Sequence, residues 1–480
     1  MILAIDQGTT SSRAILLDAK GRLIASHSVA IVQHYPKPGW VEHDPKDIWS
    51  SVEKSIVGAI RKARISPKKI LSIGISNQRE TVSLFDGDKP LHRFIVWQDR
   101  RTSDECQKLK KFEKIIQKKS GLPVDPYFSS TKIRWLIEKL KISPSQKSIR
   151  FRTIESFLIS KMSRKDFTEA TNASRTSLMN LQSLKWDPEL LEIFGIPKSF
   201  CPEIISSQNT EIKTKGLHFL PDGIPISGIL GDQQAALFGQ MGWRAGEGKI
   251  TFGTGSFILL NAGEKPIESK NSLVSTLAIQ WKDRKKLYAL EGSAFICGAW
   301  IQWLRDELKL IKNSAEIENL AEKVSSSEGV MVIPALSGMG APFWKPEMRG
   351  EILGLTRGSS QSHLARASLE ALAFQNRALI DAMKKDSPGL KLNWKVDGGA
   401  VKNNLLMQIQ ADILQSTIIR PKNLEATAFG AGMLSAHALD LIDLKTIEKS
   451  WKQERSFKPQ RTSSADLVPL YARWLQRVSS

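Results

Sequence analysis

Apolar and polar residues alternate at the start of the chain in a pattern that predicts a β-meander. Residues 2–5 and 14–28 are apolar or alternating, and the polar stretch 6–13 and the turn at 19–21 separate the strands that they predict. The first turn, DQGTTSSR, combines a carboxylate, a glycine and four consecutive hydroxyl residues. It contains no lysine and a strand follows it, so the pattern differs from the glycine-rich loop and helix of P-loop nucleotide sites.

Two later segments repeat the arrangement of a strand followed by a glycine-containing turn. Residues 248–264 predict a strand, a turn and a strand, with the sequence GTG at 253–255 at the bend. Residues 392–414 predict a strand, the sequence DGGA and an amphipathic helix that begins near Asn403. The repetition predicts two similar lobes that each bring a phosphate-binding hairpin to one nucleotide, with the third turn at its adenosine.

The first hairpin offers groups that bind phosphate and a metal ion. Backbone N–H groups around Gly8 and the guanidinium fork of Arg13 can converge on phosphate oxygens, because anion sites need concave sets of donors. Asp6, at the end of the strand, is the negative group left to hold Mg²⁺ through water. An ordinary polar turn is the alternative for this stretch taken alone. The hydroxyl groups that we expect at the phosphates are those of Thr9, Thr10, Ser11 and Ser12.

Polar residues also interrupt two predicted strands where apolar residues are expected. The stretch 70–85 reads as a buried strand broken by NQRE at 77–80, and burying these groups without partners costs several kcal/mol. In 224–240, Asp232 and Gln233 stand between a strand and an apolar helix. Asp232 is either a helix cap or a catalytic carboxylate, since α/β proteins place catalysis at the carboxyl ends of strands.

Length and composition limit the class of protein. A chain of 480 residues with 41% hydrophobic residues is expected to form at least two globular domains, and we place their boundary in 242–249, giving domains 1–241 and 242–480. No apolar run is long enough for a membrane helix, and no secretory signal is recognisable at the start. Three widely spaced cysteines fit free thiols, so we expect a cytoplasmic protein without integral membrane association.

The net charge of +20 does not by itself indicate a nucleic-acid partner. In residues 106–120 the lysines surround one helical stripe made of Leu109, Phe112, Ile115 and Ile116, which is the pattern of a solvated helix face. No interleaved aromatic motif of nucleic-acid proteins is present. We therefore expect no nucleic acid among the partners.

Taken together, the motifs resemble those of the FGGY carbohydrate kinases over essentially the whole chain. The resemblance implies two actin-like (ribonuclease H-like) α/β domains with ATP and Mg²⁺ in the cleft between them. It also implies transfer of the γ-phosphoryl group of ATP to a terminal hydroxyl of glycerol, giving sn-glycerol 3-phosphate in the entry step of glycerol catabolism. The matching segments, in order, are DQGTTSSRA, YPKPGWVEHDP, SNQRET, WQDRR, VDPYFSSTK, TNASRT, GDQQAALFGQ, FGTGSF and DGGAVKNN.

The resemblance also assigns roles to individual residues. Asp232 would be the general base and Asp6 the acidic residue on the magnesium side. The implied polyol contacts are Arg79, Glu80, Tyr127, Asp232 and Gln233, with Trp97 and Phe257 beside the carbon chain. The implied nucleotide contacts are Thr10, Arg13, Thr254, Gly298, Gln302, Gly399 and Asn403.

Two other functions remain open at this stage. Another FGGY sugar or polyol kinase would share the nucleotide motifs and differ in the acceptor pocket. A non-catalytic, ATP-binding actin-like regulator is the second alternative, and the presence of both Asp6 and Asp232 argues against it.

One loop also suggests a regulatory partner. His218 precedes Phe219 at a spacing similar to that of relatives activated when a phosphocarrier protein phosphorylates this histidine, and a surface histidine without a role is the alternative. We expect a homodimer or homotetramer.

Overall fold

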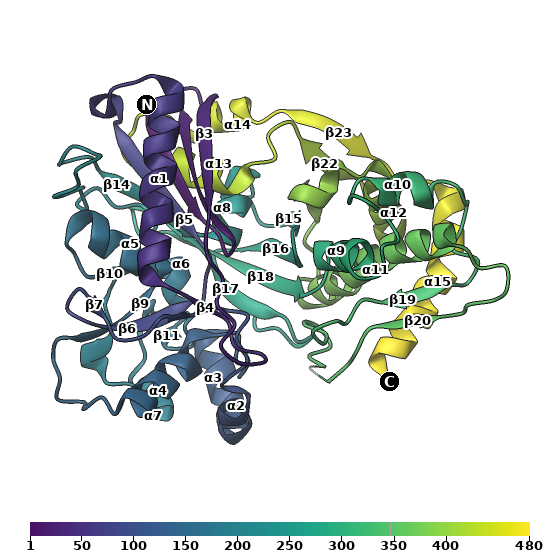
Figure 1. The fold of residues 1–480 in the computed structure, drawn as a ribbon, viewed down its shortest axis with the longest axis horizontal. Coiled ribbons are helices and arrows are strands. Elements are labelled where there is room, and N and C mark those ends of the chain that lie inside the picture. Colours follow the sequence, from purple (N-terminus) through teal and green to yellow (C-terminus); the bar gives the residue numbers. More distant parts are fainter. Residues whose placement is uncertain (346) are drawn as a thin grey trace.

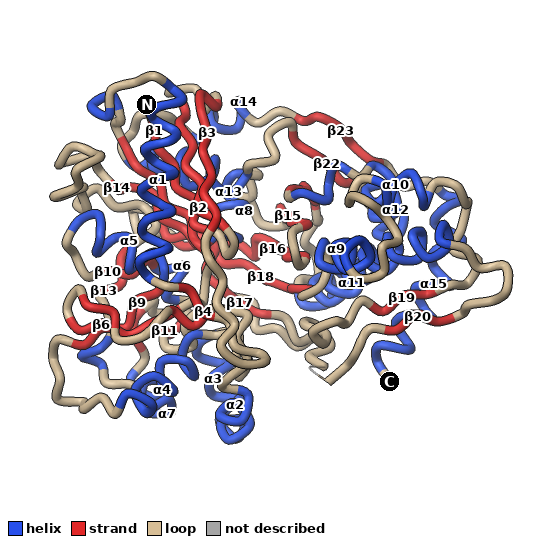
Figure 2. Tube along the Cα trace, in the orientation of Figure 1, coloured by secondary structure: helices blue, strands red, loops and turns tan. Residues whose placement is uncertain are grey.

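The computed structural model describes residues 1–345 and 347–480, which form two α/β lobes (Figure 1). The first lobe contains most of the N-terminal half of the chain. The second contains the long helices α11 (Gln361–Asp386) and α15 (Arg461–Ser479) and the C-terminus. Helices cover the sheets of both lobes (Figure 2).

The first lobe is built on a five-stranded sheet with the order β14-β5-β1-β2-β3. Strands β1, β2 and β3 are antiparallel neighbours, which confirms the predicted meander, whereas β5 lies parallel to β1 and β14 parallel to β5. The carboxyl ends of β1, β5 and β14 therefore meet at one edge. The strands are β1 Ile2–Gln7, β2 Ser11–Leu17, β3 Leu23–Ala30, β5 Ser72–Asn77 and β14 Ile226–Gly231.

Two helices from distant parts of the sequence pack on this sheet. Helix α1, Pro45–Ala63, begins after Asp44, whose carboxylate accepts a hydrogen bond from the Lys46 N–H at 2.8 Å. Helix α13, Ala426–Ala438, comes from the C-terminal half of the chain and packs against β1, β5, β14 and α8 (Asp232–Gly239). A Cβ at Gly74 would lie 2.2 Å from the Ala431 carbonyl oxygen, so the close approach of α13 requires glycine there.

The predicted domain boundary at 242–249 remains a proposal.

The stretch 70–85 forms two strands in different sheets, so its interpretation as one interrupted strand is wrong. Strand β5 ends at Asn77, and β6, Val82–Asp86, belongs to a second sheet with the order β4-β8-β6-β7 and with β9 also paired to β6. Between them Glu80 has a φ of 62°, a left-handed conformation that turns the chain. The other strands of this sheet are β4 Glu42–His43, β7 Lys89–Pro90, β8 Phe94–Ile95 and β9 Ile149–Thr153.

Short helices and two-stranded ribbons complete the first lobe. The predicted helix at 106–120 is present in pieces, with a 3₁₀ turn at 110–112 between α2 and α3, and Leu109 and Ile116 of its stripe are buried. The helices are α2 Ser103–Leu109, α3 Glu113–Ser120, α4 Ser129–Leu140, α5 Ile154–Ser163, α6 Ala170–Ala173 and α7 Pro188–Phe194. The ribbons pair β10 Phe167–Glu169 with β13 Glu203–Ile205, and β11 Met179–Asn180 with β12 Lys185–Trp186.

The second lobe is built on a seven-stranded sheet with the order β17-β18-β16-β15-β21-β22-β23. Strands β15 and β16 form the predicted second hairpin, and β21 lies parallel to β15 on its other side. Its core includes the fully buried Trp300, Trp394 and Trp474. The strands are β15 Glu247–Phe252, β16 Ser256–Gly263, β17 Val274–Gln280, β18 Lys286–Ala294, β21 Asn393–Asp397, β22 Ile418–Pro421 and β23 Gln453–Phe457.

Helices and a small ribbon surround the second sheet. The ribbon pairs β19 Met331–Ile333 with β20 Glu351–Leu353. Among the residues that the structure describes, no helix is long and apolar enough to cross a membrane. These helices are α9 Gly298–Asp306, α10 Glu316–Ala321, α11 Gln361–Asp386, α12 Asn404–Leu414 and α15 Arg461–Ser479. Helix α14, Leu444–Ser450, instead packs through Ile447 into the core cluster that contains Ile2 and Ile15 of the first lobe.

Candidate active site

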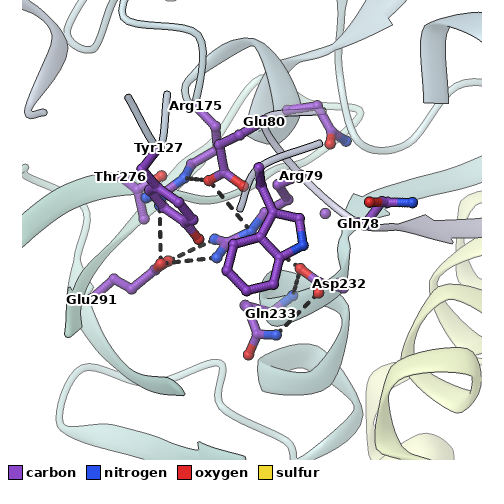
Figure 3. Close-up of polar contacts among 12 residues, drawn as sticks. Gln78, Arg79, Glu80, Tyr127, Arg175, Asp232, Gln233, Thr276 and Glu291 are labelled. Carbon is purple, nitrogen blue, oxygen red and sulfur yellow. Dashed lines mark hydrogen bonds and ion pairs between the residues drawn. The ribbon is translucent and has the colours of Figure 1, made fainter. Parts of the chain in front are cut away.

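The predicted acceptor-binding residues meet where β5 and β14 end (Figure 3). Arg79 and Glu80 follow β5, and Asp232 follows β14 as the first residue of α8. Because Gly231 and Asn77 pair in register, the two strands deliver these side chains to the same edge of the sheet. The side chains of Arg79 and Glu80 are 2% exposed, whereas that of Asp232 is 30% exposed, so Asp232 is the carboxylate that a ligand can approach.

Every hydrogen-bonding nitrogen of Arg79 points at an acceptor in this cluster. Its Nε lies 3.1 Å from the Asp232 carboxylate, and its two terminal nitrogens donate to the carboxylate of Glu291 at 2.6 and 2.8 Å. Nη1 also donates to Gln234 Oε1 at 3.1 Å. A bidentate guanidinium–carboxylate pair is among the strongest orienting contacts in proteins, so the direction of Arg79 is fixed.

Glu291 and Arg175 support this cluster and were not among the predicted site residues. Arg175 donates from Nε to Glu80 at 2.5 Å and from Nη2 to Glu291 at 3.0 Å. Burial would raise the pKa of Glu291, but the guanidinium groups of Arg175 and Arg79 outweigh it and lower this pKa to about 2. Glu291 is therefore ionised, and it joins β18 of the second lobe to the residues after β5 of the first.

Aromatic side chains stand beside these polar groups. The ring centroids of Trp97 and Tyr127 are 5.7 Å apart and those of Trp97 and Phe257 are 6.1 Å apart, both pairs edge to face. Tyr127 also lies 6.4 Å from Phe295, a ring that the sequence had not singled out. Trp97 Nε1 donates to Thr9 Oγ1 at 2.9 Å. Because Phe257 follows the turn of the second hairpin and Thr9 lies in the first, Trp97 links the two hairpins.

Gln233 is connected to the second lobe through a buried lysine. Its Nε2 donates to Asp232 Oδ2 at 3.1 Å, and its Oε1 accepts from Lys249 Nζ. Lys249 also donates to Thr251 Oγ1 at 2.7 Å, and the Thr251 hydroxyl donates to Asp397 at 2.5 Å. Burial lowers the pKa of Lys249 to about 8, against the attraction of Asp397 and Asp232.

The first hairpin presents some of the predicted phosphate-binding groups and turns others away. Thr10 is exposed, and Thr9, Ser11 and Arg13 are half-buried. Ser12 points to the opposite face of β2, where it is fully buried and its hydroxyl shares a 2.7 Å hydrogen bond with Ser51. We therefore leave Ser12 out of the nucleotide site.

Two more groups of this hairpin are already engaged. The Gly8 N–H closes the turn by donating to the Ser11 carbonyl at 2.9 Å. Arg13 forms an ion pair with Glu425, the residue before α13. A phosphate that binds Arg13 would therefore either displace the Glu425 carboxylate or share the guanidinium with it.

Asp6 lies opposite Arg13 in the register of β1 and β2. Burial and the negative charges of Asp232 and Glu425 raise the pKa of Asp6 to about 7, although Arg13 opposes them. This surplus of negative charge fits a divalent cation. Within residues 1–345 and 347–480 no group of three or more histidine, cysteine or acidic side chains could hold a metal ion, so a cation here would depend on water and phosphate oxygens for its other ligands.

The second hairpin and α9 place Thr254 and Gly298 together. The N–H groups of Cys297 and Ala299 donate to the Thr254 carbonyl at 2.8 and 3.1 Å, and the Gly298 N–H donates to the Gly253 carbonyl at 2.9 Å. Thr254 is exposed at the turn. Gln302, one helical turn after Gly298, is also exposed.

The third predicted turn lies directly beside the second hairpin. A Cβ at Gly398 would lie 2.4 Å from the Phe252 carbonyl oxygen, and Gly398 has a φ of 95°, so both space and conformation require glycine. Gly399 is exposed with no atom near its missing side chain. The side chain of Asn403 caps α12 by accepting from the Leu406 N–H at 2.7 Å, which leaves its amide nitrogen to a ligand.

His218 has its contacts elsewhere. Its side chain is 76% exposed, its Nε2 lies 3.0 Å from Glu53 of α1, and its ring packs on Phe219 with centroids 5.2 Å apart. None of these partners belongs to the predicted acceptor or nucleotide site.

The three supporting residues missed from the sequence left a weak signal there. Glu291 and Lys249 are charged residues flanked by glycine and an apolar residue inside strands, an anomaly similar to the one that drew attention to residues 77–80. Arg175 lies within the motif TNASRT. Their partners in the acceptor cluster, Arg79, Glu291 and Gln233, lie between 16 and 212 positions away in the sequence, so the pairing became visible only in the fold.

The chain is similar over most of its length to curated proteins named glycerol kinase. It is 50% identical to a glycerol kinase of Bdellovibrio bacteriovorus, with 99% of each chain covered. It is 48% identical to a glycerol kinase of Paraburkholderia phytofirmans, with 95% of this chain and 93% of that protein covered.

Solved structures agree with this comparison. The structure of Plasmodium falciparum glycerol kinase with ADP matches with a TM-score of 0.91 and 33% identity, covering 99% of this chain and 98% of the other. A xylulose kinase of Lactobacillus acidophilus matches with a TM-score of 0.89 at 24% identity, which shows the shared fold. The matches confirm the predicted two-domain, actin-like α/β fold.

Family models give the classification directly. The N-terminal domain of the FGGY family of carbohydrate kinases matches residues 1–239, and its C-terminal domain matches residues 248–439. The chain therefore belongs to the FGGY family of carbohydrate kinases.

Proposed function

We propose that this chain is an enzyme that transfers the γ-phosphoryl group of ATP to a terminal hydroxyl of glycerol, giving sn-glycerol 3-phosphate and ADP. The observation that carries the proposal is the meeting of Arg79, Glu80 and Asp232 beside the rings of Trp97 and Tyr127. A three-carbon polyol needs a hydrogen-bonding partner for each hydroxyl and an apolar surface for its C–H edges. The close relatives named glycerol kinase support this acceptor.

Asp232 is the proposed general base. It is the most exposed acidic side chain of the cluster, and the Arg79 and Gln233 contacts fix the direction of its carboxylate. The attacking hydroxyl oxygen forms a bond to the γ-phosphorus, the bond from that phosphorus to the ADP oxygen breaks, and the hydroxyl proton passes to Asp232. Phosphoryl transfer depends mainly on positioning and charge stabilisation, so an ordinary carboxylate is sufficient.

Arg79 and Glu80 are the proposed hydrogen-bonding partners of the remaining hydroxyls. Their side chains are held from behind by Glu291 and Arg175, so little conformational freedom is lost when the polyol binds. Trp97, Tyr127 and Phe257 would line its carbon chain, and Gln233 would complete the acceptor site.

The proposed nucleotide site lies along the three glycine-containing turns. Thr10 and Thr254 are the exposed hydroxyl groups of the two hairpins, and the first turn adds Thr9, Ser11 and Arg13. The second lobe would bind the rest of the nucleotide through Gly298, Gln302, Gly399 and Asn403. The match to a solved glycerol kinase with ADP supports the use of ATP and ADP.

Asp6 would hold Mg²⁺ through water. When bound, the ion would neutralise charge on the phosphate oxygens during transfer. Burial and the negative charges of Asp232 and Glu425 raise the pKa of Asp6 to about 7, and such a cation would favour the ionised form of its carboxyl.

The proposal also covers the location of the protein in the cell and its protein partners. The three free cysteines fit a reducing cytoplasm. A homodimer or homotetramer stays a prediction from the sequence. A phosphocarrier protein could reach the ring of His218 because this side chain is 76% exposed, and we propose it as a partner.

A coupled assay of ADP formation tests the acceptor. We expect ADP formation with glycerol and little with xylulose, gluconate or no acceptor. Equal or greater rates with xylulose or gluconate would instead assign the chain to another activity of the family. If glycerol, xylulose and gluconate all fail to support ADP formation, the proposed glycerol kinase activity is refuted.

A further inference from the structure

A buried lysine occupies the space between the acceptor residues and the second hairpin. Lys249 of β15 is fully buried, and its ammonium donates to Gln233 Oε1, to Thr251 Oγ1 at 2.7 Å and to the Phe257 carbonyl at 3.4 Å. These contacts use all three donors of an ammonium, and all three acceptors are neutral. Burying a charge without a directly bonded carboxylate is costly, so the contacts of Lys249 call for a reason beyond stability.

On the acceptor side, Lys249 fixes the orientation of an amide. Because Gln233 Oε1 faces the ammonium, the amide nitrogen faces Asp232 and donates to Oδ2 at 3.1 Å (Figure 3). The opposite orientation would place the amide oxygen against the Asp232 carboxylate and the amide N–H₂ against the ammonium. Lys249 therefore fixes, through the Gln233 amide, the contact at Asp232 Oδ2, whereas Arg79 and the Gln233 backbone N–H hold Oδ1.

On the nucleotide side, Lys249 fixes the direction of a hydroxyl. Thr251 Oγ1 accepts from Lys249 and therefore donates onward, to Asp397 Oδ1 at 2.5 Å. Thr251 and Asp397 are register partners on the parallel strands β15 and β21. Asp397 is 2% exposed and stands immediately before Gly398 and Gly399.

The contacts form one continuous chain from Asp232 through Gln233, Lys249 and Thr251 to Asp397. Its two ends lie at the proposed base and at the turn proposed to meet the nucleotide. Every link is a hydrogen bond of set direction, and Lys249 donates in both directions. A displacement of the turn after Asp397 thus changes the contacts that hold Gln233, and a displacement of Gln233 changes those that hold the turn.

We propose that Lys249 is a positioning residue that couples occupation of the nucleotide site to the arrangement of Asp232. The inference rests on the proposed function, because it takes Asp232 as the base and the turn at 398–399 as a nucleotide contact. It assigns Lys249 no contact with either substrate. Coupling between sites is reciprocal, so glycerol tightens ADP binding by the same factor by which ADP tightens glycerol binding.

Two substitutions test the chain at different links. Lys249→Met keeps the length of the side chain and removes all three donors. Thr251→Val removes the hydroxyl that links Lys249 to Asp397 and leaves the contact between Lys249 and Gln233 in place. The readouts are the ADP dissociation constant with and without saturating glycerol, measured by calorimetry, and the steady-state constants. For the parent protein we expect glycerol to tighten ADP binding by about fivefold or more.

The expected results differ between the two variants. Lys249→Met should abolish the coupling and lower kcat by roughly tenfold to a hundredfold, because Gln233 no longer holds Asp232. Thr251→Val should abolish the coupling and leave kcat within about threefold, because the Lys249–Gln233 contact persists. Thermal unfolding of each variant confirms that it is folded when it is assayed.

Lys395→Met is the matched control. Lys395 is the register partner of Lys249 on β21, and its ammonium donates to the Gln240 carbonyl at 2.6 Å. None of its described side-chain hydrogen bonds involves Asp232, Gln233, Lys249, Thr251 or Asp397. This variant should keep the coupling of the parent. Folded Lys249→Met or Thr251→Val protein with parental coupling would overturn the inference, as would an active parent that shows no coupling. A parent without glycerol-dependent ADP formation would overturn the proposed function itself.

Discussion

Replacement of Glu291 by glutamine should impair glycerol binding without any direct contact between Glu291 and glycerol. The Glu291 carboxylate accepts two hydrogen bonds from Arg79 and one from Arg175, at 2.6 to 3.0 Å. Glutamine is nearly isosteric, but it offers one acceptor oxygen and turns an N–H₂ group toward a guanidinium. In the variant, the buried guanidinium groups of Arg79 and Arg175 therefore face one fewer negative charge.

The magnitude follows from the burial of this cluster. Removing one partner of a buried ion pair costs about 3–5 kcal/mol, and the side chains of Arg79, Arg175 and Glu291 are at most 2% exposed. Part of this cost lowers the free energy of unfolding. The other part weakens glycerol binding, because Arg79 is no longer held in the same direction. We expect the KM for glycerol to rise by roughly tenfold to a hundredfold, which corresponds to about 1.4–2.8 kcal/mol, and the KM for ATP to change by less than about threefold.

The assay is glycerol-dependent ADP formation, with both KM values determined, alongside thermal unfolding. Glu155→Gln is the control, because Glu155 is a fully buried glutamate that accepts from Thr153 and Thr168 and contacts no arginine in its described hydrogen bonds. This control should leave both KM values near those of the parent. A folded Glu291→Gln protein with the parental KM for glycerol would refute the argument that Glu291 directs Arg79.

Three further predictions follow from other parts of the site and fold. Asp232→Asn should lower kcat by about a hundredfold or more while glycerol binding persists, and undiminished turnover would remove Asp232 from the mechanism. Burial raises the pKa of Glu155 from 4.5 to about 7, so the folded state binds more protons than the unfolded state between these values and the parent loses stability as pH rises through them. The stability of Glu155→Gln relative to the parent should therefore increase from about pH 5 to pH 7 in denaturant titrations, and a difference independent of pH would contradict this. Incubation with phosphoenolpyruvate and phosphotransferase carriers should add one phosphate to the parent and none to His218→Ala by intact mass; an unmodified parent would exclude this partner.

The sequence predicted those parts of the site that depend on neighbouring residues. Hydrophobic alternation identified the first meander and the second hairpin, and both are present with the expected turns. Asp232 was recognisable because a carboxylate follows a buried strand and precedes an apolar helix. These features need only local backbone geometry, which the order of residues determines.

Other parts depend on contacts that no local pattern contains. Ser12 was assigned with its neighbours, but strand alternation sends its hydroxyl into the core, toward Ser51. Arg13 meets Glu425, 412 positions away, because α13 returns to the first lobe. Residues 70–85 were read as one interrupted strand because apolar residues flank the polar stretch 77–80, although the left-handed turn at Glu80 passes the chain to another sheet.

Identification of the phosphorylated product tests the central claim most directly. The purified protein would be incubated with ATP, Mg²⁺ and glycerol, and the product analysed by phosphorus NMR and with a dehydrogenase specific for sn-glycerol 3-phosphate. Our account predicts one phosphorylated glycerol per ADP formed, all of it oxidised by that dehydrogenase, and loss of this product in Asp232→Asn. ADP formation without phosphorylated glycerol, or a product that the dehydrogenase does not oxidise, would contradict it.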